Sequence, residues 1–301
     1  MQDAAGSWHP RLMFHALDHV ILAVRDLDAA SRAYAILLGL RASWRGEHPG
    51  EGTANTLFRV DNTYLELLAP VGPGATGDAV RANLEVRGEG LVGLAFATSD
   101  AEACHARLAD RGLDPEPVEN GIGRDVDSGV FREWRRVPIP LAKTRGVLMF
   151  GIEHRSPADM LPRAAPVGSE SAVVSGLDHV VVRTTDADAT AALYGDALGL
   201  RLALDRSVQD WGVRLLFFRV GGLTVEVAAG LNDDPQAEPG DRLWGLSWRV
   251  SDAELARERL REAGIDVSEV RKGRKPGTRV LTVRDGSCGV PTLLIEPVGS
   301  D

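Results

Sequence analysis

The chain has 301 residues and a mass of 32.3 kDa, more than the roughly 250 to 300 residues that one hydrophobic core usually organises. Hydrophobic residues make up 44% and charged residues 26%, as in globular rather than disordered or fibrous proteins. A net charge of -9 and a pI near 5.3 argue against nucleic acid or an anionic membrane as a partner, because both attract basic surfaces. We therefore expect a globular protein of two domains.

The two cysteines, Cys104 and Cys288, offer neither a disulfide framework nor a CxxC metal motif. No apolar run approaches the roughly 20 residues that span a bilayer, and the N-terminal segment has no run of signal-peptide length. We expect a cytoplasmic protein that binds a small molecule. The sequence leaves the oligomeric state open, a homodimer included.

A repeat organises the chain. The segment LDHVILAVRDLDAASRAYAILLGLR, which starts at Leu17, aligns with LDHVVVRTTDADATAALYGDALGLR, which starts at Leu177. The offset of 160 residues holds without a gap over 54 positions, of which 18 are identical, so we infer an internal duplication. A second pair of similar segments begins at Gly90 and Arg242. The order of units is therefore A, B, A′, B′.

Each unit predicts the same series of elements. In unit A the short run VILAV precedes Asp26, a residue type that starts helices. Apolar residues then recur at helical spacing to Leu38, and Gly39 follows where a left-handed cap belongs. Three strand-like runs come next: RASWRG, ANTLFRV and TYLELLAP in unit A, and RLALDRS, RLLFFRV and LTVEVAA in unit A′. The pattern predicts four βαβββ units and an α+β fold.

Between units B and A′ the segment RSPADMLPRAAPVGSESAVVSG is rich in Pro, Ser and Ala and has no periodic pattern. We expect a linker over residues 155–175. A first domain over 14–154 would then hold units A and B, and a second over 176–298 would hold units A′ and B′.

The series of elements resembles the vicinal-oxygen-chelate superfamily, which includes glyoxalase I, methylmalonyl-CoA epimerase, extradiol dioxygenases and bleomycin resistance proteins. The resemblance rests on DHV in the first strand and LEL in the last strand of unit A, and it covers nearly the whole chain after Phe14. The segments LDHVILAVRDLD, EHPGEGTANTLFRV and TYLELLAP are similar, more narrowly, to bacterial glyoxalase-like domain proteins. The resemblance implies two curved-sheet domains, each pairing two units around a concave cup. It also implies one divalent metal, Zn, Mn, Fe or Ni, held by first-strand and last-strand residues, although one fold hosts many reactions.

Strand parity places the candidate ligands. Side chains alternate along a strand, so His19 lies on the face opposite Val20 and Leu22, which should meet the helix. By the same argument Glu66 faces the cup together with Tyr64. The resemblance implies that His19 and Glu66 hold the metal, and that Glu66 or Tyr64 moves a proton during catalysis.

Units B and B′ lack this pair. Residues that do not bind metals stand at their histidine and glutamate positions: Gly93, Gly245, Phe150 and Leu293. Further ligands would have to come from His48, in the loop-like GEHPGEGT, or from His154 at the end of unit B. His19, His48 and Glu66 would form a two-His-one-carboxylate set. A metal-free pair of His19 and Glu66 is an equally open alternative.

In the second domain His179 and Glu226 stand at the positions of the first pair. Parity puts Arg183 and Arg249 on the same concave side, where we expect them to converge near Glu226. Such a cluster would be either an ion-pair network, which we favour, or a clamp for a carboxylate or phosphate. We expect the two cups to bind different ligands and the first cup to be the active one.

Two functions fit these observations. The first is a glyoxalase-like enzyme of the lyase or isomerase class, in which a divalent metal polarises the oxygens of a small substrate. The alternative is a metal-free ligand-binding protein of the bleomycin resistance kind. A ring-cleaving dioxygenase ranks lower, because unit B′ lacks the ligands that the resemblance demands.

Overall fold

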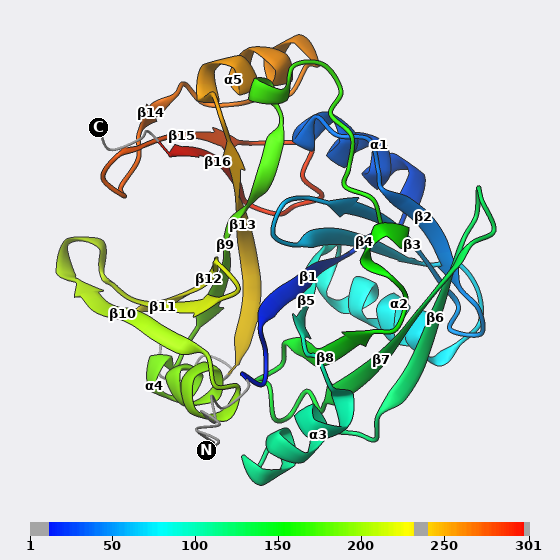
Figure 1. Ribbon diagram of the computed structural model, residues 1–301. Coiled ribbons are helices and arrows are strands. Elements are labelled where there is room, and N and C mark those ends of the chain that lie inside the picture. Colours follow the sequence, from blue (N-terminus) through cyan, green and yellow to red (C-terminus); the bar gives the residue numbers. More distant parts are fainter. Residues whose placement is uncertain (1–11, 232–239, 298–301) are drawn as a thin grey trace, which may run out of the picture.

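The computed structural model describes residues 12–231 and 240–297. Its strands form two curved sheets, one for each pair of units, which lie side by side in Figure 1. The first sheet closes into a barrel in the order β1-β4-β3-β2-β6-β7-β8-β5, and the second is an open sheet in the order β10-β11-β12-β9-β13-β16-β15-β14. The predicted α+β fold of two curved sheets built from βαβββ units is confirmed.

The elements follow the predicted order in all four units. Unit A contains β1 (Ala16–Ala23), α1 (Leu27–Leu38), β2 (Trp44–His48), β3 (Thr53–Arg59) and β4 (Tyr64–Pro70). Unit B contains β5 (Gly90–Ala97), α3 (Ala101–Asp110), β6 (Glu119–Asp125), β7 (Phe131–Ile139) and β8 (Leu148–His154). Unit A′ contains β9 (Val174–Thr184), α4 (Ala187–Ala191) with a π-helical turn at Ala192–Ala197, β10 (Arg201–Val208), β11 (Val213–Val220) and β12 (Leu223–Gly230). Unit B′ contains β13 (Asp241–Val250), α5 (Ala253–Glu262), β14 (Arg271–Lys272), β15 (Thr278–Val283) and β16 (Thr292–Pro297).

Helix α1 begins and ends where its sequence predicts. The Asp26 carboxylate accepts a hydrogen bond from the N–H of Ala29, which caps the first turn. Gly39 ends the helix with a φ of 70°, and its N–H donates to carbonyls of the last turn. Tyr34 and Leu37 are fully buried in the apolar core that runs through both sheets. The helix therefore covers the outer face of the first sheet and leaves the inner face for the site.

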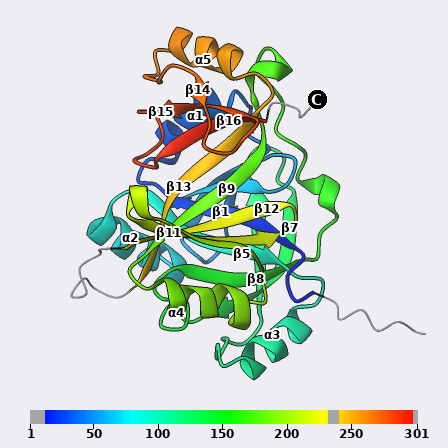
Figure 2. The same cartoon turned by 90° about the vertical axis from the view of Figure 1, so that its left-hand side faces the viewer.

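Helix α2 (Ala75–Arg87), which the repeat pattern does not predict, lies between units A and B. Its Val80 and Leu84 pack in one cluster with Ile21 and Leu68, whose side chains face the inside of the barrel. Figure 1 shows α2 within the ring of barrel strands, and Figure 2 shows it at one side of them. Helix α2 therefore closes one end of the first barrel.

The segment between β8 and β9 is attached to the first barrel. Leu161 packs in one cluster with Trp44, Leu57 and Tyr64 of the barrel. Two short 3-10 turns, Ala158–Met160 and Glu170–Ala172, are its only regular elements within the described chain. No helix in residues 12–231 and 240–297 is long and apolar enough to cross a membrane.

Candidate functional site

The structure brings His19 and Glu66 together inside the first barrel. Strands β1 and β4 are parallel neighbours, with Ile21 opposite Glu66 in the register. The Nε2 atom of His19 lies 3.3 Å from Oε2 of Glu66. The two residues are only 3% and 8% exposed, so their charges are shielded from bulk water. They form a buried acid–base pair inside the barrel.

Asp18 holds the other side of the His19 ring. Its Oδ1 lies 2.7 Å from Nδ1 of His19, and its Oδ2 lies 2.9 Å from Nε2 of His154. His154, a candidate metal ligand from the sequence, therefore bonds to Asp18 behind His19 instead of approaching Glu66. It is the last residue of β8, so its side chain lies at the rim of the barrel.

His48 ends strand β2 and does not lie in the expected loop. Its Nε2 lies 3.2 Å from Nδ2 of Asn55, and its Nδ1 lies 2.8 Å from the hydroxyl of Thr53. Asn55 also donates to Oε1 of Glu66 at 2.7 Å. Because Asn55 donates to it, His48 is a neutral imidazole that accepts at Nε2 and donates from Nδ1. Asn55 was not among the predicted site residues, although strand parity in ANTLFRV puts this amide on the inner face.

Burial and hydrogen bonds act in opposite directions on this group. Burial would lower the pKa of His19, but its hydrogen bonds to Asp18 and Glu66 outweigh burial and raise the pKa to about 9. Burial would raise the pKa of Glu66, but the contact with His19 holds it below the usual range. Hydrogen bonds from His154 and His19 likewise outweigh burial and hold the pKa of Asp18 well below its ordinary value. At neutral pH His19 is therefore an imidazolium between two carboxylates.

Aromatic side chains enclose the pair. The ring of Tyr64 stacks on His19 with centroids 4.5 Å apart, and Phe150 meets His19 edge-on at 5.7 Å. Burial raises the pKa of Tyr64 well above its ordinary value, so Tyr64 is a neutral phenol. Phe150 stands where the resemblance would put a second glutamate, so unit B supplies an apolar wall.

Arg132 is a second residue of the site that was not predicted from the sequence. It lies on the inner face of β7, is only 8% exposed, and has its guanidinium 5.4 Å from the centre of the Trp44 ring. Its guanidinium makes no hydrogen bond or ion pair with any residue in the described part of the chain. A guanidinium with no carboxylate partner can bind an anion, so Arg132 is suited to receive an anionic group of a ligand.

The donors inside the barrel do not complete a metal site. No three His, Cys, Asp or Glu side chains in residues 12–231 and 240–297 are arranged to hold a metal ion. His19 and Glu66 would be two ligands, but His48 is engaged by Asn55 and Thr53. A catalytic metal usually has about three protein ligands and an open position. No third ligand is therefore positioned to bind a metal together with His19 and Glu66 among the described residues.

The corresponding pair in the second sheet is looser. His179 Nε2 lies 3.6 Å from Glu226 and only 2.8 Å from the hydroxyl of Ser247. The other ring nitrogen lies 2.9 Å from Asp178. Burial raises the pKa of Glu226, the opposite of the shift at Glu66. The two pairs share a layout and differ in protonation chemistry.

The structure separates Arg183 and Arg249, which the sequence analysis expected to converge near Glu226. Arg249 Nε lies 3.1 Å from Asp178, whereas Arg183 lies over the ring of Trp244 at 5.7 Å. Arg249 is paired with Gly176 of β9, which precedes Arg183 by seven residues. Seven residues span about 20 Å along a strand. Parity gives the face on which a side chain lies, not its position along the strand.

Comparisons with known proteins agree with this fold. Residues 17–196 match the family described as "Glyoxalase-like domain", and residues 178–282 match "Glyoxalase/Bleomycin resistance protein/Dioxygenase superfamily". An ethylmalonyl-CoA/methylmalonyl-CoA epimerase from Cereibacter sphaeroides is 27% identical over 101 residues, which are 32% of this chain and 75% of the epimerase.

Two solved structures show the same fold over nearly the whole chain. A mutant of 4-hydroxymandelate synthase from Streptomyces coelicolor has a TM-score of 0.66 at 17% identity and covers 96% of this chain and 94% of its own. A hypothetical protein from Staphylococcus aureus has a TM-score of 0.65 at 12% identity and covers 93% and 98%. With the family match over more than half of its residues, the chain belongs to the glyoxalase-like domain family of the vicinal-oxygen-chelate superfamily.

Proposed function

We propose that this protein is an enzyme of the isomerase or lyase class that moves a proton on a small oxygenated substrate inside the first barrel. The buried pair of His19 and Glu66, backed by Asp18, carries the proposal. Paired titratable groups with shifted pKa values concentrate at functional sites. Unit B has Gly93 and Phe150 at the corresponding positions, so the acid–base pair comes from unit A alone.

The residues divide the chemistry between them. Glu66 would take a proton from a carbon next to a carbonyl, so that the electron pair of the C–H bond becomes a C=C bond and the π pair of the carbonyl moves onto its oxygen. Protonated Glu66 would then return a proton to carbon as the carbonyl reforms. His19, an imidazolium, would donate a hydrogen bond to the negative oxygen that forms. The low pKa of Glu66 keeps it ionised, as a base must be, and a substrate that displaces His19 from it would raise its proton affinity.

Two further groups inside the barrel support an oxygen-rich, anionic substrate. Oδ1 of Asn55 is buried without a hydrogen-bond partner in the described part of the chain, so it can accept from a substrate hydroxyl. Arg132 has no anionic partner there and would bind a carboxylate. Tyr64, a neutral phenol stacked on His19, would orient the substrate.

The divalent metal that the resemblance to the superfamily implies stays a prediction for this chain. His19 and Glu66 would be its first two ligands, with His48 third and His154 acting only through Asp18. Because the third donor is engaged by Asn55, we assign no step of the reaction to a metal.

The test is proton exchange with solvent. Wild type would be incubated in D₂O with 2-oxo acids, 2-hydroxy acids and 2-alkylmalonyl thioesters, the last because of the epimerase relative, and loss of the C–H signal followed by NMR. We expect Glu66→Gln to slow exchange by about a hundredfold or more. Glu226→Gln, the matched change in the second sheet, should leave it within about twofold of wild type. Exchange that survives Glu66→Gln would overturn the assignment.

A second function is favoured by one observation: the His19, Glu66, Asn55 and His48 group is already closed by hydrogen bonds among its members. Such an interior would also suit a metal-free protein that sequesters a ligand. In that case ligands would bind with no exchange at any carbon, and Glu66→Gln would weaken binding only.

A further inference from the structure

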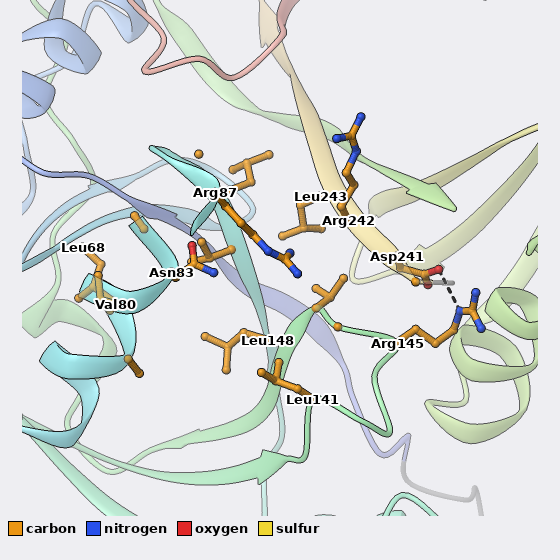
Figure 3. A pocket seen from close by; sticks show the side chains of 18 of the residues that line it. Leu68, Val80, Asn83, Arg87, Leu141, Arg145, Leu148, Asp241, Arg242 and Leu243 are labelled. Carbon is orange, nitrogen blue, oxygen red and sulfur yellow. Dashed lines mark hydrogen bonds and ion pairs between the residues drawn. The ribbon is translucent and has the colours of Figure 1, made fainter. Parts of the chain in front are cut away.

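A groove of about 1540 Å³ lies between the first barrel and the second sheet, outside the site just described. Helix α2, residues 141–148 and the first half of β13 bound it, and Figure 3 shows Leu141, Leu148 and Leu243 on its walls. Pockets for drug-sized ligands are typically about 300 to 1,000 Å³. The groove therefore has room for an elongated ligand.

The lining is basic in an acidic protein. Five arginines line the groove: Arg87, Arg136, Arg145, Arg183 and Arg242. Three carboxylates lie among them, in a chain whose net charge is -9. Of these, Asp241 has a side chain with 0% exposure that is bound by Arg145 at 2.9 Å, and Glu119 is bound by Arg136. Two carboxylates are thus already neutralised, and the surface left for a ligand is positive.

Several polar groups in the groove have no partner. The guanidinium groups of Arg87 and Arg242 make no hydrogen bond or ion pair with any residue among those described, and that of Arg183 lies over the ring of Trp244. Nη2 of Arg145 and Oδ1 of Asn83 are buried and unbonded. Figure 3 shows Arg87 extending from α2 into the space that faces β13. The donors of these guanidinium groups, which come from α2 on one side of the groove and from β9 and β13 on the other, are free to bind an anion that lies in the groove.

The groove reaches the first barrel through one aromatic side chain. Phe150 lines the groove, and its ring lies 5.7 Å from that of His19. Leu68, another lining residue, follows Glu66 by two positions on the same inner face of β4. A ligand in the groove would thus have one end a single side chain away from the acid–base pair.

We propose that this groove binds the polyphosphate end of an elongated substrate whose other end reaches the first barrel; the second half of this statement rests on the proposed function. A carboxylate engages one or two guanidinium groups, whereas two linked phosphoryl groups carry enough charge and acceptors for several. The apolar walls of Leu141, Leu148 and Leu243 would contact the uncharged middle of the ligand.

Calorimetric titration with ADP, with inorganic pyrophosphate and with malonate tests the proposal. We expect ADP and pyrophosphate to bind wild type, and Arg87→Ala and Arg242→Ala each to lower the affinity by about tenfold. Arg261→Ala, an exposed arginine of α5 outside the groove, should have no effect. Equal affinity in all four proteins, no binding of ADP, or a preference for malonate over pyrophosphate would overturn the polyphosphate assignment.

Two further measurements separate this proposal from the proposed function. Glu66→Gln should bind ADP as wild type does, because Glu66 does not line the groove. The KM of any exchanging thioester should rise in Arg87→Ala and Arg242→Ala with kcat little changed. An unchanged KM would contradict substrate binding in the groove and would leave the role of Glu66 intact. If ADP binding depended on the arginines but proton exchange were unchanged in Glu66→Gln, the groove would be supported and the role of Glu66 contradicted.

Discussion

The hydroxyl of Ser247 lies 2.8 Å from Nε2 of His179, at the register position where the first barrel has Ala95 beside His19. The methyl group of Ala95 cannot form a hydrogen bond, so Nε2 of His19 is left facing Glu66. His179 instead has a hydroxyl partner and stands 3.6 Å from Glu226. This side chain on the neighbouring strand is therefore one of the differences between the two pairs.

The first prediction concerns the proton on His19. Since Glu66 helps to raise its pKa to about 9, Glu66→Gln should lower the pKa of His19 toward 6.5 by removing one of two anionic partners. Titration by NMR of the imidazole resonances measures this. Glu226→Gln is the matched control and should leave the His19 curve in place. If the pKa of His19 were unchanged in Glu66→Gln, Asp18 alone would be responsible for raising it.

The same shift predicts how stability depends on pH. The folded-state pKa of His19 is raised from 6.5 to about 9, so its contribution is complete below pH 6.5 and is lost as pH rises through 9. The loss amounts to no more than about 3 kcal/mol. Urea unfolding at pH 6 and pH 9 should show the decline in wild type and a smaller one in His19→Ala. Equal declines in wild type and His19→Ala would show that other groups cause the pH dependence.

Helix α2 offers a test of the barrel itself. Leu84 is 3% exposed and packs against the inner face, whereas Val86 on the same helix is 84% exposed. Leu84→Ala should lower the free energy of unfolding by about 2 to 5 kcal/mol, and Val86→Ala by no more than about 0.5 kcal/mol. Urea unfolding monitored by tryptophan fluorescence gives both values. Equal effects would show that α2 does not close the barrel in solution.

The repeat and the alternation of side chains were sufficient to predict the four units, the caps of α1 and the meeting of His19 with Glu66. They could not predict α2, because PVGPGATGDAVRANLEVRG combines several glycines with a short apolar stripe of Val80 and Leu84. Nor could they distinguish a barrel from an open sheet. The first sheet closes through only two residue pairs of β2 and β6, Gly46 with Asp125 and Glu47 with Arg124.

Only part of the site could be predicted, for a related reason. Alternation gives the face of a residue and nothing about what stands opposite it in another strand. Asn55 and Arg132 were therefore overlooked, although both lie at inward positions, and Arg183 and Arg249 were placed together although they lie far apart. His154 was on the predicted face, but its partner Asp18 comes from the other unit of the barrel.

The last prediction concerns the metal. At neutral pH the nitrogen of His19 that would bind a metal carries a proton, and His48 is held by Asn55 and Thr53. Metal must displace that proton and break those hydrogen bonds, so we expect less than one equivalent at pH 7 and more as pH approaches 9. The measurement is elemental analysis after dialysis against Zn(II), Mn(II), Fe(II) and Ni(II), beside His19→Ala and Glu66→Gln. One tightly held equivalent at pH 7 that both variants lose would show that His48 or another donor moves into place, and would restore the metal-assisted reaction. Equal, near-zero metal in all three proteins at both pH values would remove the metal and leave proton transfer, or ligand binding alone, to the side chains of the barrel.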